Sequence, residues 1–335
     1  MGHNIFIASG PLHTEFFRSE SCDASYIKFP GFSPVYSRYL PQYLMVFLQL
    51  PLLLFHAVRD NIRLRRLIRE HNIAIVISDN RFGLWSRRVK CVYITHQLII
   101  PFPRYLRILE PLGSSLHRLI IKKYTFCFIP DLPGEINLSG RLSHGTELPP
   151  NAMYTGILSR FAGGHTGRSA GSESFPHNTV ILSGPEPQKG MLRQKLVKVL
   201  KDASPSTVIL EGKPGENVNK EMEGNLIFYS HLEAAEMAHL IKRSKSIICR
   251  PGYTTIMELA SLGCSALLVP TPGQTEQEYL AGYLSEKGWF ASVNQKDIRE
   301  SLPLADNKPL IDPRITAMSR ELLERALAGL LEEHH

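Results

Sequence analysis

Short apolar runs recur along the chain, and longer stretches with an apolar position at every third or fourth residue separate them. Apolar runs of four to eight residues are typical of buried strands, whereas the longer periodicity indicates amphipathic helices. The strands predicted in the first half cover residues 4–9, 26–29, 73–78, 89–95 and 126–129. Those predicted in the second half cover residues 179–183, 206–210, 226–229, 246–249 and 265–269.

Helices are predicted over residues 12–20, 42–71, 104–123, 188–201, 233–243, 254–262, 275–287 and 312–332. We expect the longest of them to kink at Pro51, because a proline inside a helix lacks the N–H that the hydrogen-bond ladder needs. The alternation of strands and helices predicts an α/β fold with parallel sheets and helices on both faces.

The composition changes near the middle of the chain. Residues 161–177 are rich in Gly and Ser and have no apolar period, which predicts a linker. Together with the length of 335 residues, this indicates two doubly wound, Rossmann-like domains facing a cleft, residues 1–160 and 178–311. The charged amphipathic segment 312–335 is predicted to be a helix that packs back on the N-terminal domain.

The composition, with 43% hydrophobic and 21% charged residues, is that of a soluble globular protein. The five cysteines form neither a CxxC pair nor a metal-ligand spacing, so we expect reduced thiols, a cytoplasmic compartment and no metal site. The N-terminus lacks the pattern of a signal peptide, and no stretch reaches the roughly 18 apolar residues of a membrane span.

The net charge of +7 fits a mildly basic cytoplasmic protein, or attraction to phosphates or to an anionic membrane face. Arginines cluster within residues 63–69 and 87–88. Aromatic residues are not interleaved with them, so nucleic-acid binding is not expected.

The stretch from Cys249 to Ala281 places many hydrogen-bonding groups between two predicted strands. Gly252 in the turn lets a ligand approach the backbone, because it has no Cβ. Thr254 and Thr255 open a helix, and the free N–H groups of a helix start suit an anion such as a phosphate. Plain capping of the helix by threonine would explain the same pattern without a ligand.

Glu258 favours the ligand-binding interpretation. It lies on the same helix face as Thr254 and has apolar neighbours, among which an unpaired carboxylate would be costly. There it can accept both hydroxyls of a ribose while a diphosphate rests on the helix start. The next loop carries Gln274, Gln277 and Glu278, whose polar groups can read sugar hydroxyls. The parts together predict a nucleotide-sugar site.

This segment resembles the donor-binding region of GT-B glycosyltransferases, and most of all the family 28 group with the peptidoglycan enzyme that adds N-acetylglucosamine to lipid I. The matching positions are Gly252, Glu258, Pro270, Gln277, Glu278 and Tyr279, with residues 183–186 after the first strand of the second half. The resemblance covers the whole C-terminal half, whereas the N-terminal half is similar only in its strand–helix order.

The resemblance implies a GT-B fold and an inverting, metal-independent transfer from a nucleotide sugar, with UDP as the expected nucleotide and no cofactor. The donor-binding residues it predicts are Gly184, Arg250, Gly252, Tyr253, Thr254, Glu258, Gln274, Gln277 and Glu278. Within this set, residues 252–254 and Gly184 are assigned to the diphosphate, Glu258 to the ribose, and Gln277 with Glu278 to the sugar.

The start of the chain departs from the family pattern. Family members carry a Gly-rich loop with a histidine after their first strand, near the reacting centre. Nothing before Asn4 supplies these residues, and Gly10-Pro11 is a poor phosphate loop. Either the fold starts differently or about one strand–helix unit is missing, in which case donor binding is kept while catalysis depends on what precedes Met1.

Polar residues also follow two predicted strands of the N-terminal half. Asp79 and His96 lie at carboxyl ends that face the predicted cleft, and either could be the base that deprotonates an acceptor hydroxyl. A turn residue and a neutral loop histidine are the simpler interpretations. Asn80, Arg81 and Gln97 are the acceptor-side candidates.

The stretch 44–55 is strongly apolar and predicts a helix that is packed in the core or touches a membrane with the help of the arginines at 59–69. Membrane contact would suit a lipid-linked acceptor at the inner membrane face, although the acceptor itself is unknown. The leading hypothesis is a cytoplasmic glycosyltransferase that moves a hexose or N-acetylhexosamine. The alternatives are a nucleotide-sugar 2-epimerase and a non-catalytic nucleotide-sugar-binding protein.

Overall fold

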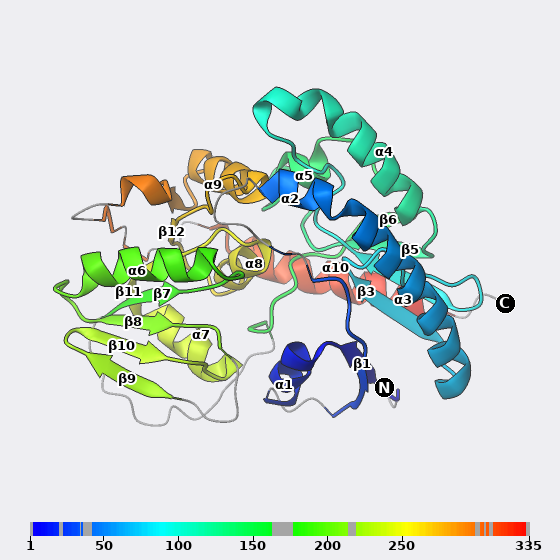
Figure 1. Ribbon diagram of the computed structural model, residues 1–335, viewed down its shortest axis with the longest axis horizontal. Helices are drawn as coiled ribbons and strands as arrows, with labels where there is room; N and C mark the ends of the chain where they lie inside the picture. The colour runs from blue at the N-terminus through cyan, green and yellow to red at the C-terminus, as the bar shows by residue number, and fades with distance from the viewer. Residues whose placement is uncertain are drawn as a thin grey trace.

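The computed structural model describes most of the chain, and Figure 1 shows how its elements are arranged. The described residues are 3–19, 23–33, 35, 42–162, 177–213, 219–298, 302–304, 306–307 and 311–332. Residues 163–176, most of the predicted linker, and residues 333–335 of the predicted C-terminal helix lie outside this part of the chain. The elements before and after the predicted linker form two α/β halves, and a C-terminal helix runs from one half to the other.

The C-terminal half is built on one seven-stranded sheet with the order β13-β12-β11-β7-β8-β10-β9. Its strands are β7 (His177–Ile181), β8 (Thr207–Leu210), β9 (Lys220–Glu223), β10 (Leu226–Tyr229), β11 (Ser244–Cys249), β12 (Leu267–Leu268) and β13 (Ala291–Ser292). All neighbouring strands are parallel except β9 and β10. The chain order reverses between β7 and β11, which is the arrangement of a doubly wound nucleotide-binding sheet.

Helices pack on this sheet, and its central strands are apolar on both sides. The helices of this half are α6 (Gln188–Leu200), α7 (Ala234–Arg243), α8 (Tyr253–Ser261), α9 (Thr275–Glu286) and the short η2 (Gln295–Asp297). Leu192 and Leu196 of α6 pack in one core cluster with Ile248 of β11. Ile247 and Cys249 of the same strand belong to a second cluster, with α7 and α8.

The N-terminal half contains two separate sheets. The strands β3 (Ile75–Asp79), β4 (Lys90–Ile94), β5 (Phe126–Ile129) and β6 (Ala152–Tyr154) form a parallel sheet in that order, and β1 (Phe6–Ser9) pairs with β2 (Ser25–Lys28). Strand order in the four-stranded sheet follows chain order, so these four strands contain no reversal. The helices are α1 (Pro11–Ser19), α2 (Gln42–Leu48), α3 (Leu50–His71), η1 (Arg104–Leu109), α4 (Glu110–Ile121) and α5 (Arg141–His144).

The predicted α/β fold with parallel sheets is confirmed. The long predicted helix is interrupted at Gln49 rather than at Pro51, because Pro51 occupies the second position of α3, where the backbone N–H has no partner inside the helix. The prediction missed β6, β9 and β13, which have only three, four and two residues.

The C-terminal helix α10 (Arg314–Leu331) packs on the four-stranded sheet of the N-terminal half (Figure 1). Its residues Ala326 and Leu330 form a small core cluster with Val92 of β4 and Phe128 of β5. The Nζ atom of Lys90 donates a hydrogen bond to the carbonyl oxygen of Leu330 at 2.8 Å. The last helix therefore ties the two halves together.

The segment after β6 meets α10 at a crossing point. Gly156 has a φ of +71°, and a Cβ atom there would collide with the backbone of Ser319, so the position requires glycine. The next residue, Ile157, donates its N–H to Ser319 Oγ at 3.0 Å. Two connections between the halves thus touch at one place.

Candidate functional site

The reversal of strand order brings two glycine turns together at the carboxyl edge of the C-terminal sheet. Ile181 at the end of β7 is the register partner of Cys249 at the end of β11. Gly184 follows the first of these strands and Gly252 follows the second. In open α/β sheets, ligands bind at the carboxyl edge beside such a reversal.

The structural requirement for glycine differs between positions 184 and 252. Gly184 has a φ of +91°, a conformation that other residues rarely adopt. Gly252 has an ordinary φ of −73°, and a Cβ atom there would meet only Thr255 Oγ1, at 4.0 Å. Neither the backbone conformation nor the packing of the described residues explains Gly252, and the space in front of it is open to a ligand.

The helix start beside Gly252 is uncapped. Gly252 is the N-cap of α8 and supplies no side-chain hydrogen bond to the first turn. Thr254 is exposed and lies inside the helix, so it does not have the capping position that the simpler interpretation gave it. The N–H groups of such a first turn, with the positive end of the helix dipole, are suited to an anion.

The side chain of Arg250 points into the interior and not toward this open space. It is 2% exposed and donates to the carbonyl of Val269 at 2.9 Å and to Oε1 of Gln295 at 2.6 Å. Burial lowers the pKa of Arg250 to about 10, so the guanidinium is still charged at neutral pH. The Arg250 side chain therefore does not make the predicted direct contact with a donor. Its charge only makes the electrostatic potential beneath the turn more positive.

Tyr253 is also buried. Its hydroxyl donates to the carbonyl of Pro130 at 2.9 Å, and burial raises the pKa of the phenol well above its usual value. Its ring stacks on the ring of His96, with centroids 4.2 Å apart and planes 6° apart. Only the backbone of Tyr253 is placed to meet a ligand at the helix start.

Glu258 is buried on α8 and forms an ion pair that the sequence did not predict. The Oε1 atom of Glu258 lies 2.8 Å from Nε of Arg160, which belongs to the segment after β6. A buried carboxylate needs such a partner. The residue predicted to bind the ribose therefore also links the C-terminal half to the segment that leaves the N-terminal half.

The glutamine-rich loop before α9 is organised by its own side chains. Gln274 Oε1 accepts the N–H of Gln277 and caps α9. Gln277 Oε1 accepts the N–H of Thr271 at 2.8 Å, and Glu278 Oε1 accepts the N–H of Gly273 at 2.8 Å. The three predicted sugar-reading residues fix the shape of the loop, and their roles toward a sugar stay predictions.

Glu276 is one of the side chains of α9 that face the N-terminal half. Its Oε1 atom lies 2.8 Å from Nε2 of His96, and Gln97 Nε2 lies 3.3 Å from the same nitrogen. Burial acts to raise the pKa of Glu276, but hydrogen bonds from His96, Gln97 and Gln274 and the charge of His96 hold it below its usual value. His96, a predicted base, is thus oriented by a carboxylate from the other half.

Asp79 ends β3 beside β4, on the same sheet edge as His96. The Asp79 side chain is exposed, yet neighbouring protein atoms partly desolvate its carboxyl group and raise the pKa of that group. The charge of His96 acts in the opposite direction and lowers this pKa. The neighbouring Asn80 adopts a φ of +50° and accepts a hydrogen bond from Tyr93 at 2.8 Å. Both predicted bases therefore lie at one edge.

Arg81 has a partner within the N-terminal half. Its Nη2 atom lies 2.6 Å from Oδ2 of Asp60 on α3, and its guanidinium lies over the ring of Phe29. These contacts join the loop after β3 to α3 and to the residue after β2. To bind an acceptor, the guanidinium of Arg81 would have to contact the acceptor and Asp60 at the same time.

Comparison with known proteins agrees with this geometry. Residues 207–310, from β8 to beyond η2, match the glycosyltransferase family 28 C-terminal domain. We refer to residues 207–310 as the family 28 domain, after the domain that they match. This domain contains α8, α9 and the turn at Gly252, whereas β7 and Gly184 precede it.

Relatives of the family 28 domain include two bacterial enzymes named UDP-N-acetylglucosamine--N-acetylmuramyl-(pentapeptide) pyrophosphoryl-undecaprenol N-acetylglucosamine transferase. The enzyme from Burkholderia cenocepacia is 30% identical over 175 residues, 50% of this chain and 44% of the relative. The one from Caldanaerobacter subterraneus is 30% identical over 108 residues, 32% and 29% of the two chains. The chain spans less than half the length of these relatives.

Among solved structures, the spinosyn rhamnosyltransferase SpnG has a TM-score of 0.58, 14% identity, and coverage of 98% of this chain and 89% of that chain. The glycosyltransferase of kitacinnamycin has a TM-score of 0.56 and 13% identity, with coverage of 98% and 88%. These similarities concern the fold alone. The predicted fold, two parallel α/β halves with GT-B glycosyltransferases as structural neighbours, is confirmed.

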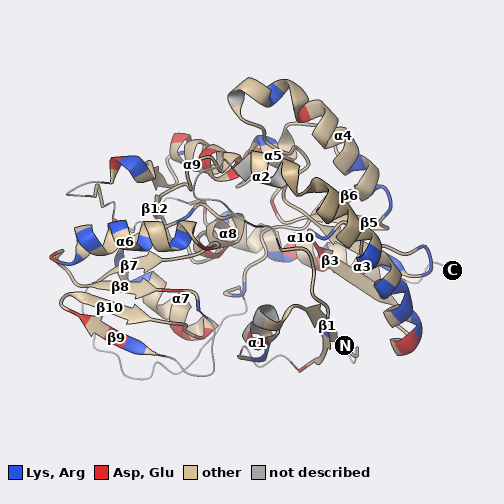
Figure 2. Cartoon of the chain, viewed as in Figure 1, with Lys and Arg blue, Asp and Glu red and all other residues tan. Residues whose placement is uncertain are grey.

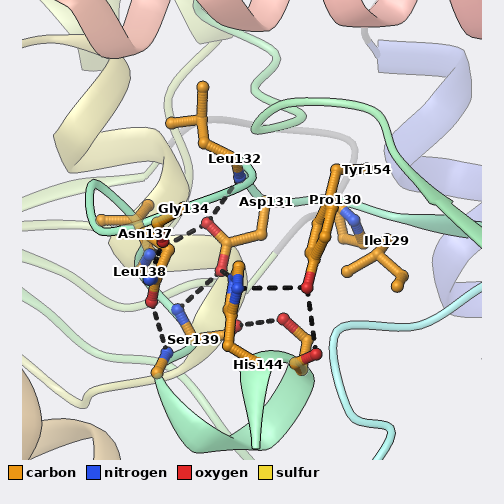
Figure 3. Close-up of polar contacts among 12 residues, drawn as sticks. Ile129, Pro130, Asp131, Leu132, Gly134, Asn137, Leu138, Ser139, His144 and Tyr154 are labelled. Carbon is orange, nitrogen blue, oxygen red and sulfur yellow. Dashed lines mark hydrogen bonds and ion pairs between the residues drawn. The ribbon is translucent and has the colours of Figure 1, made fainter. Parts of the chain in front are cut away.

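A loop of the N-terminal half supports α9 of the family 28 domain. Asp131 after β5 is fully buried and accepts backbone N–H groups from Leu132 and Leu138 on Oδ1 and from Ser139 on Oδ2, at 2.8 to 2.9 Å (Figure 3). Nε2 of His144 lies 3.4 Å from the same carboxylate. Asp131 therefore organises this loop, which explains its conformation without a catalytic role.

The same loop contacts α9 directly. Tyr283 Oη donates to Asn137 Oδ1 at 2.8 Å, and the N–H of Arg141 donates to Tyr279 Oη at 2.7 Å. The loop thereby fixes the position of α9, and with it Glu276. No group of three His, Cys, Asp or Glu within the described residues could hold a metal ion.

Sequence reasoning missed Arg160 and Glu276. Arg160 is the last residue of the predicted N-terminal domain, next to the Gly- and Ser-rich stretch, where no pattern marked it. Glu276 was visible as an acidic residue in the first turn of a predicted helix, which suits the helix dipole without any ligand. Nothing in the sequence indicated that this turn faces His96.

Proposed function

We propose that this protein transfers a hexose or N-acetylhexosamine from a nucleotide sugar, with UDP as the nucleotide, to an acceptor hydroxyl with inversion at the anomeric carbon and without a metal ion. The observation that carries the proposal is the uncapped start of α8 beside the strand reversal, in front of a glycine that neither conformation nor packing explains. The family 28 match over residues 207–310 supports it.

The C-terminal half would hold the donor. The diphosphate rests on the N–H groups of residues 252–254, with Gly184 approaching from the facing turn and the charge of Arg250 beneath. The ribose hydroxyls donate to Glu258, and the hexose meets the loop of Gln277 and Glu278. When the bond between the sugar and the diphosphate breaks, the negative charge of the leaving UDP develops where the helix dipole stabilises it.

The N-terminal half would supply the base. His96 has one ring nitrogen on Glu276, so the other nitrogen is the one that accepts the proton of the acceptor hydroxyl. The acceptor oxygen then attacks the anomeric carbon, the bond from that carbon to the diphosphate oxygen breaks, and UDP leaves. Asp79, on the same edge, is the second candidate for the base.

The names of the relatives support the finer parts of the proposal. They specify a UDP-linked donor and a lipid-linked pyrophosphate acceptor. We therefore propose a lipid-linked acceptor for this chain and action at the cytoplasmic face of the membrane. No helix within the described residues has the length and apolarity to cross a bilayer.

Calorimetric titration with UDP tests the donor site, and a valine at Gly252 is the decisive variant. The backbone there accepts any residue, so Gly252→Val is expected to fold normally and to bind UDP at least about tenfold more weakly, because the side chain fills the space before the helix start. Gly10→Val is the matched control, since Gly10 also has no protein atom near its Cβ position. Unchanged affinity in Gly252→Val would refute the donor site.

Incubation with labelled UDP-sugars and a polyprenyl-linked acceptor then separates the possible activities. Transfer of label to the acceptor is the expected result. An isomerised sugar would instead identify an epimerase, and binding without turnover would identify a non-catalytic protein.

A further inference from the structure

The candidate base and the start of the candidate donor helix are in direct contact. Tyr253 is the first residue of α8, so its backbone N–H is one of the groups that find no partner inside the helix. Its ring stacks on the ring of His96, with the centroids 4.2 Å apart and the planes 6° apart. One residue therefore touches both the place proposed for the diphosphate and the side chain proposed as the base.

The N-terminal half holds the Tyr253 side chain from two adjacent strands. Tyr253 is 4% exposed, and its hydroxyl donates to the carbonyl of Pro130, the residue after β5, at 2.9 Å. His96 follows β4, which pairs with β5. A buried hydroxyl with a hydrogen bond is costly to move, because the move would leave the donor without a partner. The Tyr253 ring is therefore a fixed surface between the halves.

The start of α9 holds His96 at the edge of its ring. Figure 2 shows the acidic residues of α9 in red, and Glu276 is one of them. Its Oε1 atom lies 2.8 Å from Nε2 of His96. The imidazole rotates about two bonds, and a contact on its face together with a hydrogen bond at its edge fixes both rotations. Two helices that carry predicted donor residues thus set the orientation of the candidate base.

The imidazole is held but not enclosed. The His96 side chain is 21% exposed, so an acceptor hydroxyl can reach it. The ring that stacks on it belongs to a residue whose backbone the diphosphate would meet. A diphosphate bound to the N–H groups of residues 252–254 restrains the start of α8, and the Tyr253 ring moves with its backbone. Occupation of the helix start therefore affects the orientation of His96.

We propose that Tyr253 is a positioning residue that links donor binding to the base. A nucleotide diphosphate at the start of α8 restrains the Tyr253 ring, and the ring holds the His96 imidazole in the orientation that accepts the proton of the acceptor hydroxyl. The inference rests on the transfer proposed above and adds an order to it, because the base is best oriented once the donor is in place. By linkage, a well-oriented His96 strengthens donor binding by the same factor.

Nuclear magnetic resonance of the full chain, labelled at histidine, tests the link without an acceptor or turnover. The face of a tyrosine ring shifts the proton signals of a stacked imidazole upfield, and His96→Gln identifies the His96 signals. We expect them to lie upfield in the unaltered chain and to move further upfield on addition of UDP, as the stacked orientation becomes more populated. UDP that binds in calorimetry without this movement would overturn the link. No binding of UDP at all would instead refute the donor site, on which the link rests.

Two variants separate the ring of Tyr253 from its hydroxyl. Tyr253→Phe keeps the ring and should show the same upfield movement on addition of UDP. Tyr253→Leu keeps a buried apolar side chain without an aromatic face, so neither the upfield position nor its movement should remain. UDP affinity should stay within about fivefold in both variants, because the N–H groups that meet the diphosphate belong to the backbone. The same movement in Tyr253→Leu would show that the link does not run through this ring.

Transfer kinetics give the second readout. Tyr253→Leu is expected to lower kcat about tenfold to a hundredfold at nearly constant KM for the acceptor, because the base is displaced, and Tyr253→Phe should recover most of the loss. Tyr154→Leu is the matched control, since Tyr154 also stacks on a histidine, His144, with centroids 4.7 Å apart and planes 8° apart. Its kcat should be nearly unchanged. Equal losses of kcat in Tyr253→Leu and Tyr154→Leu would mean that a stacked tyrosine contributes stability alone, and would refute the positioning role.

Discussion

The two halves of the protein treat their apolar surfaces differently. The C-terminal half buries both faces of its sheet, and among its described residues the exposed large apolar ones, such as Met191 and Met222, are scattered. The N-terminal half buries a smaller core and exposes whole stripes on α3 and α4. The difference shows that the C-terminal half is covered by its own helices, whereas the outer helices of the N-terminal half leave apolar side chains in contact with solvent.

The halves also differ in how their polar candidates are held. Gln274, Gln277 and Glu278 in the C-terminal half are fixed by backbone groups of their own loop. His96 in the N-terminal half is fixed by Glu276 and Tyr253, both from the other half. The loop of predicted sugar-reading residues is thus held within its own half, whereas the candidate base depends on contact between the halves.

The largest expected effect separates the two halves by function. His96→Ala should lower kcat for sugar transfer by about a hundredfold to ten-thousandfold, because it removes the proton acceptor, and should leave UDP affinity nearly unchanged. Glu276→Gln should lower kcat less at constant KM, with recovery in Glu276→Asp, as befits a positioning residue. If His96→Ala keeps full activity, His96 is not the base. Asp79 would then be the candidate, and Asp79→Asn would be expected to lower kcat instead.

The next largest expected effect is a loss of folding stability at acidic pH. Burial lowers the pKa of His117, in the N-terminal core, to about 4 from the usual 6.5. Between these values the unfolded chain binds a proton that the folded chain does not, so stability is lost as pH falls from 6.5 to 4, by about 3 kcal/mol. His117→Phe should flatten this dependence. Urea unfolding followed through Trp85 in a Trp289→Phe background measures it for the N-terminal half.

The same measurement through Trp289 gives the contrast. A Trp85→Phe chain reports the C-terminal half, which we expect to be less sensitive over this pH range. Equal acid sensitivity at both tryptophans would show that the halves unfold as one unit and would contradict their independence.

A smaller effect concerns the donor half alone. Glu258→Ala is expected to weaken UDP binding roughly tenfold to a hundredfold, because hydrogen bonds to a charged group are worth about 1.5 to 3 kcal/mol. Binding of pyrophosphate, which has no ribose, should be unaffected. If calorimetry shows both ligands weakened alike, the change acts through the Arg160 ion pair and not through a ribose contact.

The smallest effect tests the joint between the halves. Ser319→Ala removes the acceptor of the Ile157 N–H and should destabilise the protein by about 1 kcal/mol. It should also separate the urea transitions of Trp85 and Trp289. Thr316→Ala on the exposed side of α10 is the control. A loss of the same size in the control would show that it does not come from the Ile157 hydrogen bond.

Much of the fold could be predicted because its signals are local. Apolar runs located β5 and β10 to the residue, and the predicted start of α8 was one residue away from the observed one. The strand β9 was missed because all four of its residues are exposed and three of them are charged, and it forms by pairing antiparallel with β10. The separation of β1 and β2 from the larger sheet likewise depends on packing that no local pattern records.

The candidate site was less predictable, because its geometry depends on contacts between distant residues. The sequence pattern of a glycine, a helix and an acidic residue identified α8 as the candidate ligand site. It did not indicate which side chains point into the protein interior, as those of Arg250 and Tyr253 do. His96 and Glu276 are 180 residues apart in the chain. The role of Arg160 could not be predicted, because it depends on the ion pair that the segment after β6 forms with Glu258 in the folded protein.

The close packing of residue 156 against residue 319 joins the two connections between the halves at one point. The chain passes between the halves twice within reach of this point, so both connections are held by the same contact. Arg160, which pairs with Glu258, lies only a few residues after Gly156 along the chain. The connection that leaves the N-terminal half is therefore anchored twice, to α10 by Ile157 and to α8 by Arg160.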